Sequence, residues 1–146
     1  MPRLSTWLVR FALGYLVLGF TLGGLLLAHK GVGLHPALWA WRPVHVEFLL
    51  VGWMLQFVFG VGSWILPRTA ARQSPRPILV AFILVNAGVW MVSAGFLQPE
   101  MAWLILPGRL SEMGAVVAFA YHIWPRVRPF IQHRHPSPPG EPVDQP

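Results

Sequence analysis

The residues best suited to chemistry in this sequence lie in one apolar segment, "RPVHVEFLLVGWMLQFVFGVGSWILPR", residues 42–68. At 100° per residue one helical stripe carries an imidazole at its start and small or polar groups below it. Its members are His45, Leu49, Gly52, Gln56, Phe59 and Ser63. An imidazole nitrogen can ligate heme iron, and missing side chains leave room for a flat macrocycle. The alternative is an interfacial histidine above glycines that serve only helix packing.

The composition indicates where these groups must sit. The chain has 146 residues, of which 55% are hydrophobic and 11% charged, whereas soluble domains average about 25% charged residues. A soluble core of this size could not cover so much apolar surface, so we expect an integral membrane protein. The absence of cysteine excludes structural disulfides, iron–sulfur clusters and covalently attached c-type heme. A heme held noncovalently by histidine is not excluded.

Four apolar runs are long enough to span a bilayer, which takes about 20 residues each. They cover residues 7–29, 43–66, 77–97 and 101–124. The first is longer than a signal-peptide core and no good cleavage site follows it, so we expect a retained helix. The predicted fold is all-α: one transmembrane four-helix bundle over residues 1–130. The proline-rich tail, residues 131–146, is predicted to be disordered.

Basic residues are unequally divided between the two ends of these spans. One side carries Arg3, Arg10, Arg68, Arg72, Arg76, Arg126, Arg128 and Arg134. The other side carries Lys30, Arg42 and Arg109. The positive-inside rule therefore places both termini in the cytoplasm, and we expect a multi-pass protein of the bacterial cytoplasmic membrane. This distribution explains the formal net charge of +6 better than nucleic-acid binding does.

The stretch "HVEFLLVGWMLQFVFGVGSWILP", residues 45–67, resembles the second helix of subunit I in heme–copper oxidases and nitric oxide reductases. It is also similar to the short heme-binding membrane proteins of the NnrS type. The resemblance implies that His45 is an axial ligand of a b-type heme. The chain has far fewer helices than a full subunit I and lacks the later histidines that bind copper and the high-spin heme. The resemblance therefore implies electron transfer rather than reduction of oxygen or nitric oxide.

A heme with two histidine ligands needs a partner for His45. His29 ends the first span at a similar predicted depth, His35 lies in the following loop, and a second copy of the chain could supply another histidine. His122 lies on a stripe of small residues in the fourth span, toward the opposite surface. It either binds a second heme, giving a two-heme relay across the membrane, or is an interfacial residue.

Cationic and polar groups around this heme are also predicted. Arg42 and Arg109 lie on the His45 side and could hold the heme propionates, although Arg109 could instead pair with Glu112. Glu47 could pair with either arginine or bind a proton. Gly52 is predicted to make room for the ring, and Gln56 to contact its edge or a neighbouring helix.

The expected function is one-electron transfer by one heme b, or by two if His122 also binds. We expect the chain to act as a homodimer or as a subunit of a larger respiratory complex. One alternative is a five-coordinate heme that binds nitric oxide or another diatomic gas. Another is a structural or assembly subunit without a cofactor. No nucleophile–base set or pair of carboxylates at catalytic spacing is evident, which disfavours an enzyme.

Overall fold

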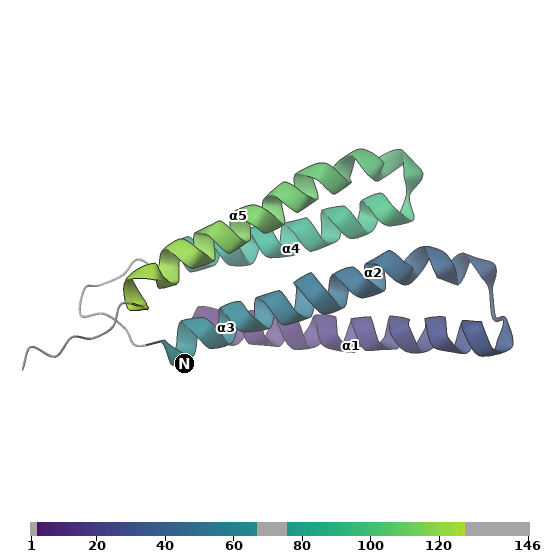
Figure 1. Cartoon of the computed structure of the whole chain (residues 1–146), viewed down its shortest axis with the longest axis horizontal. Helices are drawn as coiled ribbons and strands as arrows, with labels where there is room; N and C mark the ends of the chain where they lie inside the picture. The colour runs from purple at the N-terminus through teal and green to yellow at the C-terminus, as the bar shows by residue number, and fades with distance from the viewer. Residues whose placement is uncertain (1–2, 67–75, 128–146) are drawn as a thin grey trace, which may run out of the picture.

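The computed structural model describes residues 3–66 and 76–127, and every regular element within these ranges is helical (Figure 1). Four helical stretches there are long and apolar enough to cross a membrane: Leu4–Val32, Pro36–Ile65, Arg76–Leu97 and Pro99–Arg126. The prediction of an all-helical fold with four helices long and apolar enough to span a membrane is therefore confirmed. The predicted tail, residues 131–146, lies outside the described residues, and the side of the membrane on which the termini lie stays a prediction.

The spans pair into two helical hairpins (Figure 1). In the first, helix α1 (Arg3–Val32) packs against a second span that contains α2 (Arg42–Glu47) and α3 (Gln56–Ile65). In the second, α4 (Arg76–Leu97) packs along α5 (Ile105–Ile123). Contacts within each hairpin are more extensive than contacts between them. The polar side chains that join the two hairpins therefore need a specific explanation.

The second span begins earlier than predicted, at a short 3₁₀ helix, η1 (Pro36–Trp41). The His35 side chain caps it by accepting a hydrogen bond from the Ala37 amide at 3.2 Å. Pro36 occupies the first turn, where its missing N–H costs nothing. Between α2 and α3 the chain forms a π-helix, η2 (Phe48–Leu55). A π-helix has wider turns than an α-helix and is common at functional sites.

The fourth span is also longer than its sequence indicates. A 3₁₀ helix, η3 (Pro99–Leu104), leads directly into α5, and η4 (Trp124–Arg126) follows it. Pro107 does not interrupt the span, because it lies in the first turn of α5, where a backbone donor is dispensable. Gly108 is buried against α4. A Cβ added at Gly108 would lie only 3.1 Å from the backbone nitrogen of Val92. Close packing between α4 and α5 thus accounts for the small residues that make this span look broken.

Two apolar clusters connect the hairpins. One contains Leu8, Val85 and Phe59, whose ring stacks on Phe119 with centroids 4.2 Å apart. The other centres on Tyr15, Phe48 and Val89. Large apolar side chains elsewhere are exposed, among them Val17, Leu27, Ile83, Leu106 and Val117. In a membrane-spanning bundle such residues face lipid, which agrees with the composition.

Candidate functional site

His45 is held by helix α1. Its Nδ1 lies 2.7 Å from the Gly19 carbonyl oxygen. A carbonyl can only accept, so Nδ1 must carry the hydrogen. The imidazole lies over Gly23, where a Cβ would come within 2.6 Å of His45 Cε1. No described residue hydrogen-bonds Nε2, so the neutral ring presents a lone pair there. Histidines that ligate metals usually donate their other ring N–H in this way.

The other described histidines have their nitrogens arranged differently. Nδ1 of His29 accepts the His35 amide at 3.1 Å, and Nδ1 of His35 accepts the Ala37 amide at 3.2 Å. In the neutral rings the hydrogen is therefore on Nε2. His122 Nε2 lies 3.0 Å from Arg126 Nη2, and a guanidinium can only donate, so that lone pair is occupied. Among residues 3–66 and 76–127, His45 alone combines a donated Nδ1–H with an unengaged Nε2.

The sequence suggested that His29 lies at a similar depth to His45, but the structure places the two residues at different depths. His45 packs beside Gly19 and Gly23. His29 is six residues beyond Gly23 along α1, about 9 Å at 1.5 Å per residue. It packs edge-on against Trp39 of η1, with ring centroids 5.8 Å apart. The structure therefore brings His29 together with the connection between the first two spans and not with His45.

Gly52 of the predicted heme stripe and Gly60 at the edge of that stripe are covered by α1. A Cβ on Gly52 would lie 2.6 Å from Tyr15 Cγ, and one on Gly60 would lie 2.8 Å from Val9 Cγ2. Gly52 and Gly60 are both buried. Within the bundle, α1 thus occupies this face, as expected if the glycines serve helix packing. The prediction that Gly52 leaves room for a porphyrin inside the chain is not supported by this packing.

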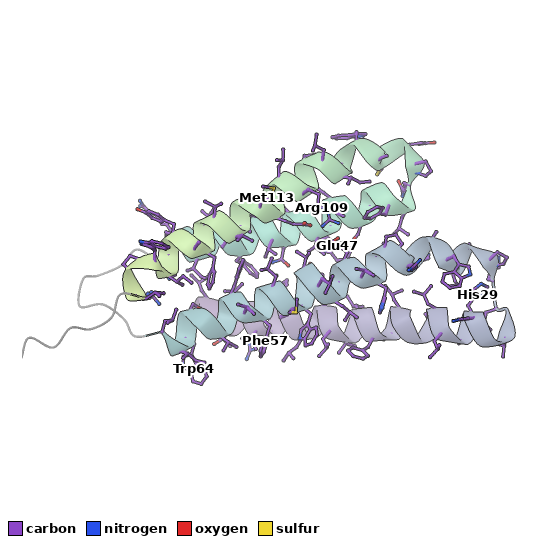
Figure 2. The ribbon with its side chains drawn as sticks, in the orientation of Figure 1. His29, Glu47, Phe57, Trp64, Arg109 and Met113 are labelled. Atoms are coloured by element: carbon purple, nitrogen blue, oxygen red, sulfur yellow. The ribbon has the colours of Figure 1, made fainter. Side chains whose placement is uncertain are left out.

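Arg109 lies in an ion-pair cluster rather than beside His45. Its Nη1 and Nη2 reach the two carboxylate oxygens of Glu47 at 3.1 and 2.7 Å, and Nη1 also reaches Glu112 Oε2 at 2.7 Å. Figure 2 shows Glu47 and Arg109 directed toward one another across the seam between the hairpins. The guanidinium is committed to carboxylates, so it is not placed to hold a propionate. Arg42 is exposed near the start of the second span and stays available.

A second polar bridge, formed by Gln56, Asn86 and Tyr15, joins the two hairpins. Gln56 is fully buried and accepts a hydrogen bond from the Asn86 side-chain amide at 3.1 Å. Asn86 also accepts one from the Tyr15 hydroxyl at 3.0 Å. Gln56 therefore contacts a neighbouring helix, which was one of its two predicted roles. Sequence reasoning missed Asn86, although a lone amide within the apolar run 77–97 was a usable signal.

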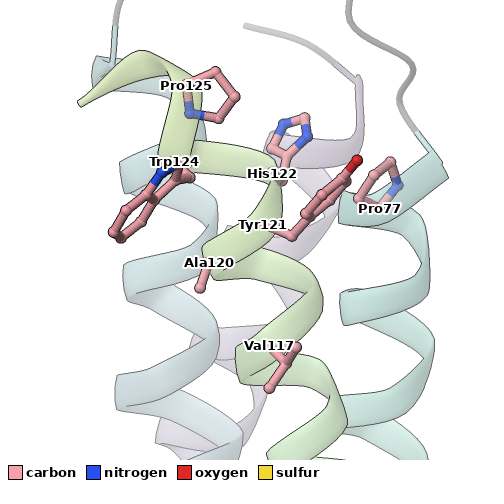
Figure 3. A pocket seen from close by; sticks show the side chains of 7 residues that line it. All are labelled: Pro77, Val117, Ala120, Tyr121, His122, Trp124 and Pro125. Atoms are coloured by element: carbon pink, nitrogen blue, oxygen red, sulfur yellow. The ribbon is translucent and has the colours of Figure 1, made fainter. Parts of the chain in front are cut away.

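His122 lines a pocket near the C-terminal end of α5 (Figure 3). The pocket has a volume of about 560 Å³ and is otherwise lined by Pro77, Val117, Ala120, Tyr121, Trp124 and Pro125. The stripe of small residues that leads to His122 faces α4, where Ser111 donates to the Leu84 carbonyl at 2.8 Å. This stripe serves helix packing, and the second heme predicted at His122 would have to compete with Arg126 for Nε2.

The described histidines meet only one requirement of a heme site. His45 presents a half-buried imidazole whose orientation suits an axial ligand. No second histidine in the described ranges is placed to complete the coordination. These ranges also contain no group of three or more His, Asp or Glu side chains that could hold a metal ion. A second histidine ligand would therefore have to come from outside the described residues or from a second copy of the chain.

Comparisons with known proteins do not assign this chain to a family. No family model, curated protein or solved structure matches it. The resemblance to the oxidase helix thus rests on residues 45–67 alone, and its functional meaning must come from the geometry described above.

Proposed function

We propose that this chain is a b-type heme protein of the bacterial cytoplasmic membrane that transfers single electrons, with His45 as an axial ligand. The observation that carries the proposal is the hydrogen bond from His45 Nδ1 to the Gly19 carbonyl at 2.7 Å. This bond fixes the ring and raises the basicity of Nε2. A bound heme would supply the one-electron chemistry, while the protein sets its potential through the ligand and its surroundings.

Two features of the chain support the rest of this proposal. Gly23 leaves the imidazole room against α1, because a side chain there would collide with the ring. Arg109 is engaged within the bundle, which leaves Lys30 and Arg42 as the basic residues of the side opposite the termini. The excess of arginine on the other side supports cytoplasmic termini.

Diatomic-gas binding is a second candidate function. It is favoured by the finding that His45 is the one described histidine with a donated Nδ1–H and an unengaged Nε2. With a single protein ligand, the iron would keep a position open for nitric oxide or a similar molecule. A shift of the Soret band when the reduced protein is exposed to the gas would favour this function over electron transfer between two histidines.

A structural or assembly subunit without a cofactor is the third candidate. The coverage of Gly52 and Gly60 by α1 favours it, because these glycines already have a packing role. This candidate predicts co-purification with a larger membrane complex and no heme absorbance.

The test is the reduced-minus-oxidised spectrum of the full chain purified after heme-replete expression. We expect a b-type α band in the wild type and in His122→Ala, but not in His45→Gly. External imidazole is added to His45→Gly to distinguish loss of the ligand from misfolding. Imidazole can enter the space beside Gly23, so recovery of the band would identify His45 as the ligand. A wild type without heme absorbance, or a His45→Gly variant with a full band, would refute the proposal.

A further inference from the structure

The cluster of Glu47, Arg109 and Glu112 lies deep in the spans. Glu47 is 11 residues from the start of its span at Pro36, and Arg109 is 10 residues from Pro99. Glu112 packs against Gly88 of α4, where a Cβ would lie 2.6 Å from Glu112 Cγ. Gly88 is 12 residues from the start of α4 at Arg76 and 9 from its end at Leu97, about 18 and 14 Å at 1.5 Å per residue. The hydrocarbon core is about 30 Å thick, so the cluster lies near its middle. Ionisable groups at such depth are costly and usually have a function.

The cluster contains one more acid than base. Two carboxyl groups contact one guanidinium, and both contact the same nitrogen, Nη1, at 3.1 and 2.7 Å. Helix α4, which packs beside α5, contributes no acidic residue, and its one basic residue is Arg76 at its first position. Tyr15 of α1 and His45 of α2 are titratable groups of the first hairpin, and they bond to Asn86 and Gly19 instead. With both carboxyls ionised, the cluster would carry an uncompensated negative charge.

The hydrogen bonds divide the two carboxyls unequally. Glu47 receives a donor on each oxygen and is 3% exposed. Glu112 receives a donor on Oε2 alone, and its Oε1 is buried without a hydrogen-bond partner. The Glu112 side chain is 9% exposed. An ionised oxygen buried without a partner is strongly disfavoured, whereas a neutral carboxylic acid is much less so.

We propose that Glu112 holds an exchangeable proton at an intramembrane site, beside the ion pair that Arg109 forms with Glu47. Arg109 neutralises one carboxylate through the paired contact with Glu47. The proton neutralises the other carboxyl, and Glu112 Oε1 is the oxygen that the contacts leave for it. The Arg109 side chain is 42% exposed, so the cluster reaches the surface of the bundle, which faces lipid at this depth. This inference does not depend on heme binding.

Infrared spectroscopy of the full chain in lipid bilayers at pH 8 tests the proposal. Ordinary glutamates and aspartates are ionised at this pH, since they titrate near pH 4. A carboxylic acid C=O stretch that shifts in D₂O then reports a protonated carboxyl in the membrane. We expect one such group in the wild type and in the control variant Glu100→Gln. Glu100 is exposed in the connection between α4 and α5.

The charge balance predicts the variants quantitatively. Glu112→Gln and Glu47→Gln should each lose the band, because one remaining carboxylate balances Arg109. Arg109→Gln should double the band, because two carboxyls then lack a cation. Absence of the band from the wild type, as a bound metal cation would cause, would overturn the proposal. Persistence of the full band in either glutamate variant would also overturn it, and these two variants decide the matter even if Arg109→Gln does not fold.

Discussion

Asn86 is the residue through which the two hairpins are joined at mid-depth. It donates to Gln56 at 3.1 Å and accepts from Tyr15 at 3.0 Å. Side-chain hydrogen bonds between membrane helices contribute about 0.6 kcal/mol on average. We therefore expect Asn86→Leu, which removes both bonds at similar volume, to lower the free energy of unfolding by about 1–2 kcal/mol. Denaturation in mixed micelles, followed by circular dichroism, measures this change.

Tyr15→Phe is the matched comparison for Asn86→Leu, because it removes only the hydrogen bond between Tyr15 and Asn86. It removes the hydroxyl but keeps the ring that covers Gly52 and packs on Phe48. Because Asn86 would keep its bond to Gln56, the loss of stability should be roughly half that of Asn86→Leu. If Asn86→Leu is as stable as the wild type, the bridge orients the helices without stabilising them.

At the level of elements, glycines set how closely α1 approaches the second span. A Cβ on Gly23 would lie 2.6 Å from His45 Cε1, so Gly23→Ala must displace the imidazole and break its bond to Gly19. Overpacking of this kind typically costs about 1–3 kcal/mol. We expect that loss in thermal unfolding of Gly23→Ala, together with loss of any heme held by His45.

Gly24→Ala is the control for that variant. Nothing lies within 4 Å of a Cβ at Gly24, and alanine is the better helix former by roughly 0.5–1 kcal/mol. Gly24→Ala should therefore unfold at the same temperature as the wild type or slightly higher. Equal stability of the two alanine variants would show that α1 can move away from His45 without cost.

The second span also shows where prediction from sequence reached its limit. Hydropathy alone predicted four helices, and the 100° stripe correctly placed Gly52, Gln56 and Ser63 on a buried face. At 100° per residue, however, Glu47 and Gln56 are half a turn apart, yet both are buried. The π-helix Phe48–Leu55 lies between them and changes the angular relation. No regular periodicity contains that change, so the stripe predicted from the sequence did not include Glu47.

The candidate site was predictable in its residue types more than in its partners. Deep ionisable groups were visible as exceptions in apolar runs, and the pairing of Arg109 with Glu112 followed from their spacing on one helix. Pairing of Glu47 with Arg109 was one of the alternatives named for Glu47. The contact joins residues 62 positions apart, and the choice of Arg109 over Arg42 depends on how the two hairpins dock. The capture of His45 by Gly19 likewise depends on the register of α1. Such contacts require the tertiary arrangement, which local pattern does not contain.

At the scale of the whole molecule, side chains among residues 3–66 and 76–127 form polar bridges between the two hairpins at three depths. Arg109 contacts Glu47, Asn86 joins Gln56, and Arg126 Nη1 donates to the Ser63 carbonyl at 3.3 Å. Lipid is as apolar as the side chains that cover the seam, so apolar burial contributes little to association inside a bilayer. We therefore expect the bridges to determine whether the hairpins recognise each other.

Co-expression of the chain as two pieces, residues 1–70 and 71–146, tests this expectation. The tagged first piece should retain the second during purification from membranes when both are wild type. Combining Asn86→Leu with Arg109→Gln in the second piece removes two of the three bridges, so we expect recovery to fall several-fold, about tenfold if 1.4 kcal/mol is lost. Val117→Leu, a change at a 69% exposed position of α5, serves as the control and should leave recovery unchanged. Equal recovery of the double variant and the control would mean that the packing of Phe59 on Phe119 and its neighbours suffices to join the hairpins. The deep polar groups would then serve to bind protons or a cofactor rather than to assemble the bundle.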